Sequence, residues 1–115
     1  MGYVIGSQVA KGGAHLIDVL RRRGKARFGD FYDATEETEA SVHKACGFDE
    51  DTDTGHACLY VEWAAGQMEK QGLVTIEANG GTLADGEPDF EIKATAKLWD
   101  LIECGGMPRY WDMDL

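Results

Sequence analysis

The sequence predicts one mixed α+β domain, and three observations support this prediction. The chain has 115 residues, of which 43% are hydrophobic and 28% are charged, as in a single folded domain with one small core. Apolar residues recur at helical spacing in several segments that each end at a glycine. Two later segments alternate apolar and polar residues, as half-buried strands do. We therefore expect helices first, then a strand pair, and then a closing helix.

The first helix is predicted over residues 14–23. Leu16, Ile17 and Leu20 share one face, and Gly24 is placed to end the helix. Three arginines in the last turn suit the negative end of the helix dipole.

Two further helices are predicted in the middle of the chain. An aromatic stretch over residues 28–35 indicates a short helix or turn, and residues 37–46 follow as a second helix. Residues 56–72 are the longest periodic stretch. The apolar stripe of this third helix contains Cys58, Val61, Ala65 and Met68.

Two paired strands are predicted over residues 73–78 and 90–95. The eleven residues between them, 79–89, are rich in Gly, Asp and Asn and predict a flexible loop, too long for a tight hairpin turn. Thr95 is placed as the N-cap of a last helix over residues 96–104.

Charge is the strongest compositional signal. The chain has 21 acidic and 11 basic side chains and a net charge of -10. Residues 1–27 hold six basic side chains and one acidic one, whereas the remainder holds five basic and twenty acidic ones. Because a field of this sign repels phosphates, the charge disfavours nucleic acid and favours a basic protein partner.

The predicted partner-binding face consists of nine carboxylates in the first half of the chain. They are Asp30, Asp33, Glu36, Glu37, Glu39, Asp49, Glu50, Asp51 and Asp53. An array of carboxylates can stand in for phosphates, so the sharpest hypothesis is a small phage-type inhibitor that mimics nucleic acid to block a basic nucleic-acid-binding partner. The alternative is a solvated face that serves only solubility.

The order of elements resembles a winged helix-turn-helix domain, with a three-helix core, a two-stranded wing and a C-terminal helix. WAAGQMEKQGLVTIE resembles the pattern in which a recognition helix ends in a Lys-x-Gly-Leu turn into the wing. EIKATAKLWDLI resembles the second wing strand running into the last helix, with Lys97 where that pattern has a glycine. The spacing from HLIDVL to VEWAAGQMEKQGLV is most similar to the N-terminal domain of Mrr-type restriction proteins, and the likeness covers residues 14–103.

The resemblance implies binding of double-stranded DNA, with the recognition helix in the major groove and the wing along the backbone. The predicted wing, however, has no Arg or Lys and carries Asp85, Glu87 and Asp89, which we expect to face outward. The alternative function is therefore a DNA-binding regulator that acts as a homodimer through a basic cluster at the C-terminal end of the first helix. This basic cluster is Arg21, Arg22, Arg23, Lys25 and Arg27.

No catalytic motif is present, so we expect neither an enzyme nor a cofactor. The spacing of Asp49, Asp51 and Asp53 is typical of the start of a calcium loop, but Thr54 and Tyr60 stand where such a loop needs Gly and Glu. We therefore predict no metal site. The three cysteines are expected to be buried thiols, because no pair has zinc-site or redox-motif spacing.

The chain divides by composition into an N-terminal segment (1–13), the winged-helix domain (14–104) and an aromatic acidic tail (105–115). The tail either folds back onto the domain or offers Tyr110 and Trp111 as a docking segment. No apolar run approaches the roughly 18 residues of a membrane span, and no signal peptide is recognisable, so we expect a cytoplasmic protein.

Overall fold

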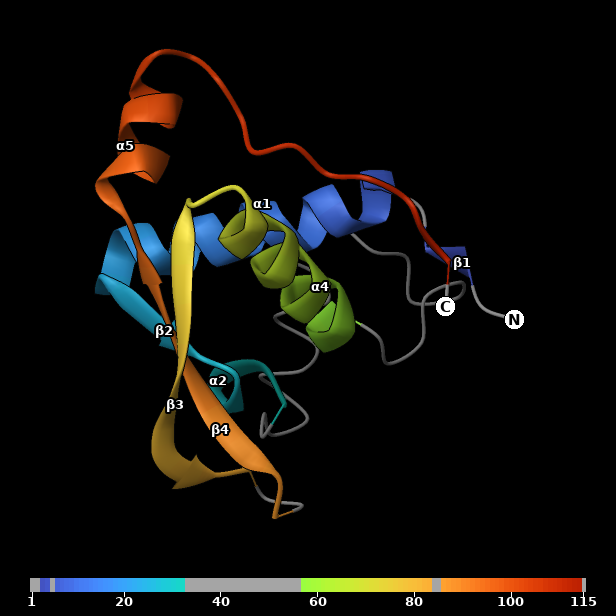
Figure 1. The fold of residues 1–115 in the computed structure, drawn as a ribbon, viewed down its shortest axis with the longest axis vertical. Coiled ribbons are helices and arrows are strands. Elements are labelled where there is room, and N and C mark those ends of the chain that lie inside the picture. The colour runs from blue at the N-terminus through green and yellow to red at the C-terminus, as the bar shows by residue number, and fades with distance from the viewer. Residues whose placement is uncertain (1–2, 5, 33–56, 84–85, 115) are drawn as a thin grey trace.

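A computed structural model describes residues 3–4, 6–32, 57–83 and 86–114, and these residues form a mixed α+β fold (Figure 1). The predicted helix over 37–46 and the loop with Asp49, Asp51 and Asp53 lie outside the described residues. The described elements are β1 (Tyr3–Val4), α1 (Gly6–Arg23), β2 (Lys25–Arg27), α2 (Gly29–Tyr32), α4 (Ala57–Lys70), β3 (Val74–Thr82), β4 (Pro88–Ala94), α5 (Ala96–Glu103) and β5 (Met113–Asp114).

Helix α1 begins at Gly6, well before the predicted start at residue 14. The Asp112 carboxylate, from the far end of the chain, accepts a hydrogen bond from the Gly6 N–H at 2.6 Å and places a negative charge at the positive end of the helix. The predicted end is confirmed, since Gly24 follows the helix with φ 81°. Sequence reasoning missed the first half of α1 because Gly12 and Gly13 disfavour a helix unless packing requires them.

Helix α4 confirms the predicted third helix. Of its predicted stripe, Val61, Ala65 and Met68 are buried in the core. The helix ends in a Schellman motif, in which the Leu73 N–H donates to the Met68 carbonyl and Gly72 adopts a φ of 75°. This motif turns the chain directly into β3.

Strands β3 and β4 confirm the predicted antiparallel pair, with Ile76 opposite Ile92. They extend further than predicted, so the expected eleven-residue loop was wrong. The strands reach Thr82 and resume at Pro88, and the Leu83 N–H donates to the Glu87 carbonyl at 2.7 Å. The unpredicted strand β2 lies on the other side of β4, giving the sheet order β2-β4-β3.

Helix α5 lies where it was predicted and buries Leu98. Thr95 occupies the predicted N-cap position, but its side chain makes no cap hydrogen bond. Its hydroxyl instead lies 2.8 Å from the Gly72 carbonyl oxygen and 3.1 Å from that of Leu73. Thr95 therefore ties the start of α5 to the end of α4 rather than capping α5.

The core lies between α1, α4, α5 and one face of the sheet. Its largest fully buried side chains are Leu16, Leu20, Met68, Leu73, Ile92, Leu98, Val9 and Val61. Within the described ranges, no helix is long and apolar enough to span a bilayer.

Candidate functional site

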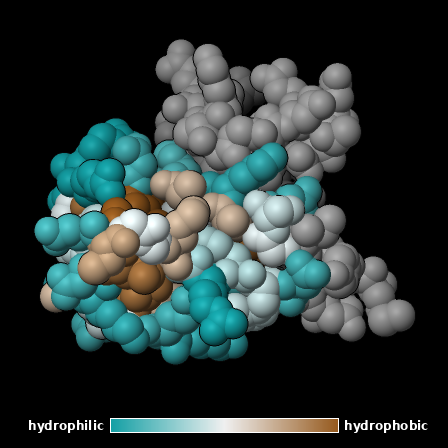
Figure 2. Space-filling model, turned by 90° about the horizontal axis from the view of Figure 1, so that it is seen from above, coloured by the Kyte–Doolittle hydropathy of each residue, from teal (hydrophilic) through white to brown (hydrophobic). Residues whose placement is uncertain are grey.

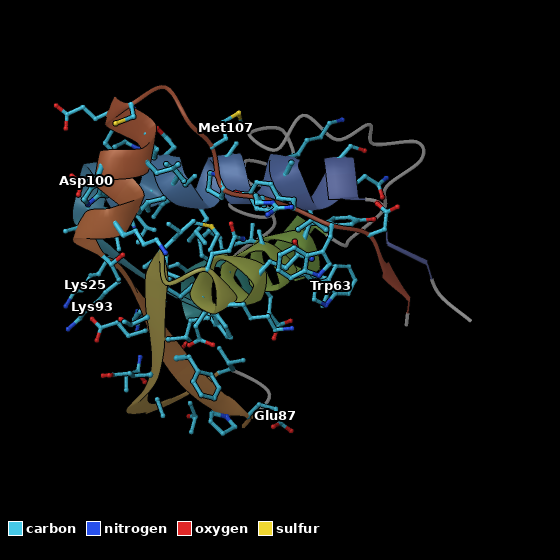
Figure 3. All side chains as sticks on the ribbon, turned by 45° about the horizontal axis from the view of Figure 1, so that its top comes forward. Lys25, Trp63, Glu87, Lys93, Asp100 and Met107 are labelled. Carbon is cyan, nitrogen blue, oxygen red and sulfur yellow. The ribbon has the colours of Figure 1, made fainter. Side chains whose placement is uncertain are left out.

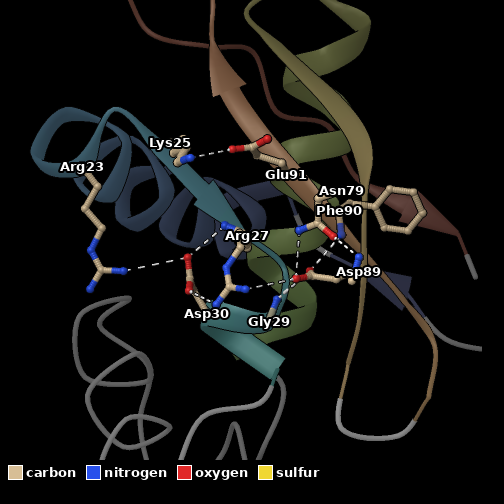
Figure 4. Close-up of polar contacts among 10 residues, drawn as sticks. Arg23, Lys25, Arg27, Gly29, Asp30, Asn79, Asp89, Phe90 and Glu91 are labelled. Carbon is tan, nitrogen blue, oxygen red and sulfur yellow. Dashed lines mark hydrogen bonds and ion pairs between the residues drawn. The ribbon is translucent and has the colours of Figure 1, made fainter.

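The predicted basic cluster lies at the end of α1 and along β2, at the edge of the sheet (Figure 4). Four of its five side chains are more than half exposed and have a carboxylate oxygen within 3.1 to 3.9 Å. The pairs are Arg22–Asp18, Arg23–Asp30, Lys25–Glu91 and Arg27–Asp30. These carboxylates offset the positive charge of the cluster locally. The cluster therefore attracts phosphates more weakly than its sequence suggests.

Arg21 is the exception within this cluster. Its guanidinium carbon lies 6.0 Å from the centroid of the Trp99 ring on α5. Within the described part of the chain it forms no ion pair. A guanidinium over an aromatic face keeps its charge available to a further anion.

Asp30 is the one member of the predicted acidic face that falls within the described ranges. Its carboxylate accepts a hydrogen bond from the Arg27 N–H at 2.9 Å and lies 3.9 Å from Arg23. The structure thus places Asp30 among the basic side chains. The other eight carboxylates of that face, from Asp33 to Asp53, lie outside the described residues.

Asp89 corrects one expectation for the wing, because its carboxylate is buried rather than facing outward. It accepts hydrogen bonds from the Gly29 N–H at 3.0 Å, the Phe90 N–H at 2.8 Å and the Asn79 amide at 3.2 Å (Figure 4). Burial acts to raise the pKa of this carboxyl, but the three hydrogen bonds, with Arg27 3.8 Å away, hold it below its usual value. Asp89 therefore joins the start of β4, near the tip of the hairpin, to α2 as a carboxylate.

The hairpin β3–β4 has one basic side chain, Lys93 near the end of β4, and its ammonium lies 3.9 Å from the Glu91 carboxylate. Residues 71–92 contain five carboxylates and no Lys or Arg. Glu77 and Glu87 are exposed, and Figure 3 shows Glu87 at the far end of the hairpin from α5. We call Glu77 and Glu87 the acidic hairpin surface. Helix α4 adds Glu62 and Glu69, with Lys70 as its one basic side chain.

The tail runs back from α5 across α1 and α4 to reach β1, as Figure 1 shows. Tyr110 is partly buried and packs against the core residues. Burial raises the pKa of its hydroxyl to about 12. Trp111 is 39% exposed, with its ring 5.9 Å from the Lys70 ammonium. Of the two predicted tail residues, one is therefore packed inside the domain and the other lies at its surface.

Two further candidate groups, Cys104 and His15, have side chains that the structure describes. Cys104 is exposed, contrary to the expected burial, and Cys46 lies outside the described residues. Burial against the Phe31 ring lowers the pKa of His15, which Asp18 only partly opposes. Across the described ranges, no three His, Cys, Asp or Glu side chains come together as a metal site.

Sequence reasoning found the basic cluster but missed its partners. Glu91 and Asp89 contact the cluster from β4, which pairs with β2. Strand β2 itself had no signal in the sequence.

The chain matches no protein-family model, no curated protein and no solved structure.

Proposed function

We propose that the chain is a winged helix-turn-helix domain that acts as a protein-interaction module. The order of elements supports this assignment: a long helix ends at Gly72, a two-stranded hairpin follows, and α5 closes the domain. In such a domain α4 is the recognition helix and β3–β4 is the wing.

The functional proposal depends on the absence of Lys and Arg over residues 71–92. A wing that tracks DNA needs Lys or Arg against the phosphates. In this wing the one basic side chain, Lys93, lies 3.9 Å from the Glu91 carboxylate, and the exposed carboxylates are Glu77 and Glu87. Carboxylates at these positions repel a duplex and attract a basic protein surface. The sharpest form of the proposal is an inhibitor whose carboxylates replace phosphates on a basic nucleic-acid-binding protein.

Charge reversal on the hairpin tests this function. The assay is displacement of a labelled DNA duplex from a purified basic DNA-binding protein, followed by fluorescence anisotropy. We expect the unaltered chain to displace the duplex and Glu77→Lys with Glu87→Lys to weaken displacement at least about tenfold, because two attractions become repulsions.

The matched control is Asp100→Lys with Glu103→Lys. It changes the net charge equally, but Asp100 lies on α5, at the opposite end of the molecule from Glu87 (Figure 3). The control should displace the duplex as the unaltered chain does. Equal losses in both variants would mean that only net charge matters, and failure of the unaltered chain to displace the duplex would reject the proposed function.

The second candidate is the DNA-binding regulator that acts as a homodimer. It is favoured by the grouping of exposed basic side chains at the end of α1, where Arg21 keeps a charge that no described carboxylate pairs. The test is anisotropy with a labelled random duplex at about 50 and 200 mM salt. Under the main proposal the duplex does not bind. Binding that weakens with salt, and is lost in Arg21→Ala with Arg22→Ala, would establish the regulator instead.

A further inference from the structure

The tail is held to α4 by an unusual set of hydrogen bonds. The Gln67 amide nitrogen donates to the Trp111 carbonyl at 3.1 Å, and the Trp111 N–H donates to the Gln67 amide oxygen at 3.1 Å. Gln71 repeats this pattern at Arg109, with distances of 2.7 and 2.8 Å. Each glutamine therefore pairs with one residue of the tail backbone through both its donor and its acceptor, as one strand does with another. We call Gln67 and Gln71 the glutamine ladder.

The spacing of the glutamine ladder explains why it works. Four residues of α-helix rise by about 6 Å, and two residues of extended chain advance by about 6.6 Å. Gln67 on α4 and Gln71, the first residue after α4, therefore match backbone groups two residues apart on an extended segment. The four hydrogen bonds of the ladder all join backbone atoms of the tail, so they can form with an extended segment of any sequence that supplies these N–H groups.

The packing of the Tyr110 ring supplies the side-chain selectivity of this site. The Tyr110 hydroxyl lies 3.7 Å from the Met68 sulfur, and its ring passes over α1 at Gly13. A Cβ at Gly13 would lie 2.1 Å from the Tyr110 hydroxyl oxygen, so the glycine makes room for the ring. The site thus accepts an extended segment with an aromatic residue between the two residues that the ladder binds.

The connection that precedes this segment borders a pocket. Where residues 106–108 cross from α5 to α1, a cavity of about 210 Å³ lies beside them, lined by Ala14, Ile17, Ile102 and others. Figure 2 shows apolar side chains gathered at this end of the molecule. Met107 is 71% exposed, and Gly105 has a φ of 81° with open space around its Cβ position. Gly105 therefore marks a hinge between α5 and the segment that the ladder holds, and at this turn the Gly106 N–H donates to the Leu101 carbonyl at 2.9 Å.

We propose that α1 and α4 form a binding site for an extended peptide, and that the tail of a second copy of this chain can occupy it in exchange for the chain's own. Every contact of the tail can form identically between two copies, so only the hinge must change conformation. This site is independent of the acidic hairpin surface.

Proline substitutions in the tail should release the tail from the binding site without changing any residue of the site itself. Arg109→Pro with Trp111→Pro removes both backbone N–H donors to the ladder in the full-length chain. The probe is a labelled peptide with the sequence of residues 105–115, followed by anisotropy. We expect it to bind this variant at least about tenfold more tightly than it binds the unaltered chain, whose site is already filled.

Two controls identify the ladder as the cause. A peptide with both prolines should lose binding at least about tenfold, whereas a peptide with Met107→Pro, outside the ladder, should bind as the original does. Adding Gln67→Leu and Gln71→Leu to the protein should abolish capture. No binding of the original peptide to a variant whose circular dichroism spectrum is native would overturn the proposal.

A second variant tests the exchange even if the proline variant does not fold. Deletion of Gly105 and Gly106 keeps the ladder and the tail intact but shortens the connection, so that a tail reaches the site of another copy more easily than its own. We expect a dimer by analytical ultracentrifugation. A folded monomer with unchanged stability would overturn the exchange between copies.

Discussion

Gly12→Ala is expected to destabilise the protein by about 3 kcal/mol, although alanine is the better helix former. A Cβ at Gly12 would lie 2.6 Å from the Tyr60 carbonyl carbon and 2.8 Å from the Val61 nitrogen, both backbone atoms of α4. Helix backbone cannot yield as a side-chain end can, so α1 and α4 would have to separate. Separation would loosen the packing of Leu16 and Met68, which lie in the core that these helices share.

Gly66→Ala is the matched control for this prediction. Gly66 also lies within a helix, α4, but a Cβ there has no neighbour within 4 Å. This change should stabilise the protein by about 0.5–1 kcal/mol through helix propensity alone. Urea unfolding followed by circular dichroism measures both variants. Equal shifts in the same direction would show that the contact between α1 and α4 is not as close as 2.6 Å implies.

Asp89→Ala is expected to cost about 2–4 kcal/mol at neutral pH, because it leaves buried donors without an acceptor. The Gly29 N–H, the Phe90 N–H and the Asn79 amide all donate to this carboxylate. Asp89→Asn should cost less, since its amide oxygen still accepts. Glu77→Ala, on an exposed position of β3, should change the free energy of unfolding by less than about 0.5 kcal/mol.

The pH dependence of stability provides an independent check on Asp89. Its folded pKa lies below its usual value of 3.8, so the unfolded chain binds the proton more readily. The carboxylate therefore contributes stability above pH 3.8, and this contribution is lost as the pH falls through the folded pKa. We expect Asp89→Ala to lose part of the acid dependence that the unaltered chain shows. An identical acid profile in both proteins would contradict the network.

The charged surfaces were only partly predictable from sequence. The basic cluster could be predicted because Arg21, Arg22 and Arg23 are consecutive in the sequence. The sequence could not show that Asp89 bonds to Gly29, sixty residues away, since that contact exists only once β4 pairs with β2. The wing carboxylates were all expected to face outward, but Asp89 is buried in the folded protein.

The tail shows the same limit. Composition identified an aromatic segment but left open whether it packs or docks. The glutamine ladder decides its path. Gln67 and Gln71 carry no signal in sequence, because an ordinary polar residue on a helix or in the turn after it is common. Their role appears only when α4 lies beside the returning chain.

The sequence by itself determined the elements whose signals are local: the stripe of α4, the glycine at its end, the alternation of β3 and β4, and the place of α5. Such patterns depend on residues that are close in sequence, within one or two helical turns, so they can be predicted from the sequence alone. Tertiary structure decided the first half of α1, strand β2, the burial of Asp89 and the path of the tail. Each of these is stabilised by a partner distant in sequence, and the free energy that offsets its local preference exists only after the chain has folded.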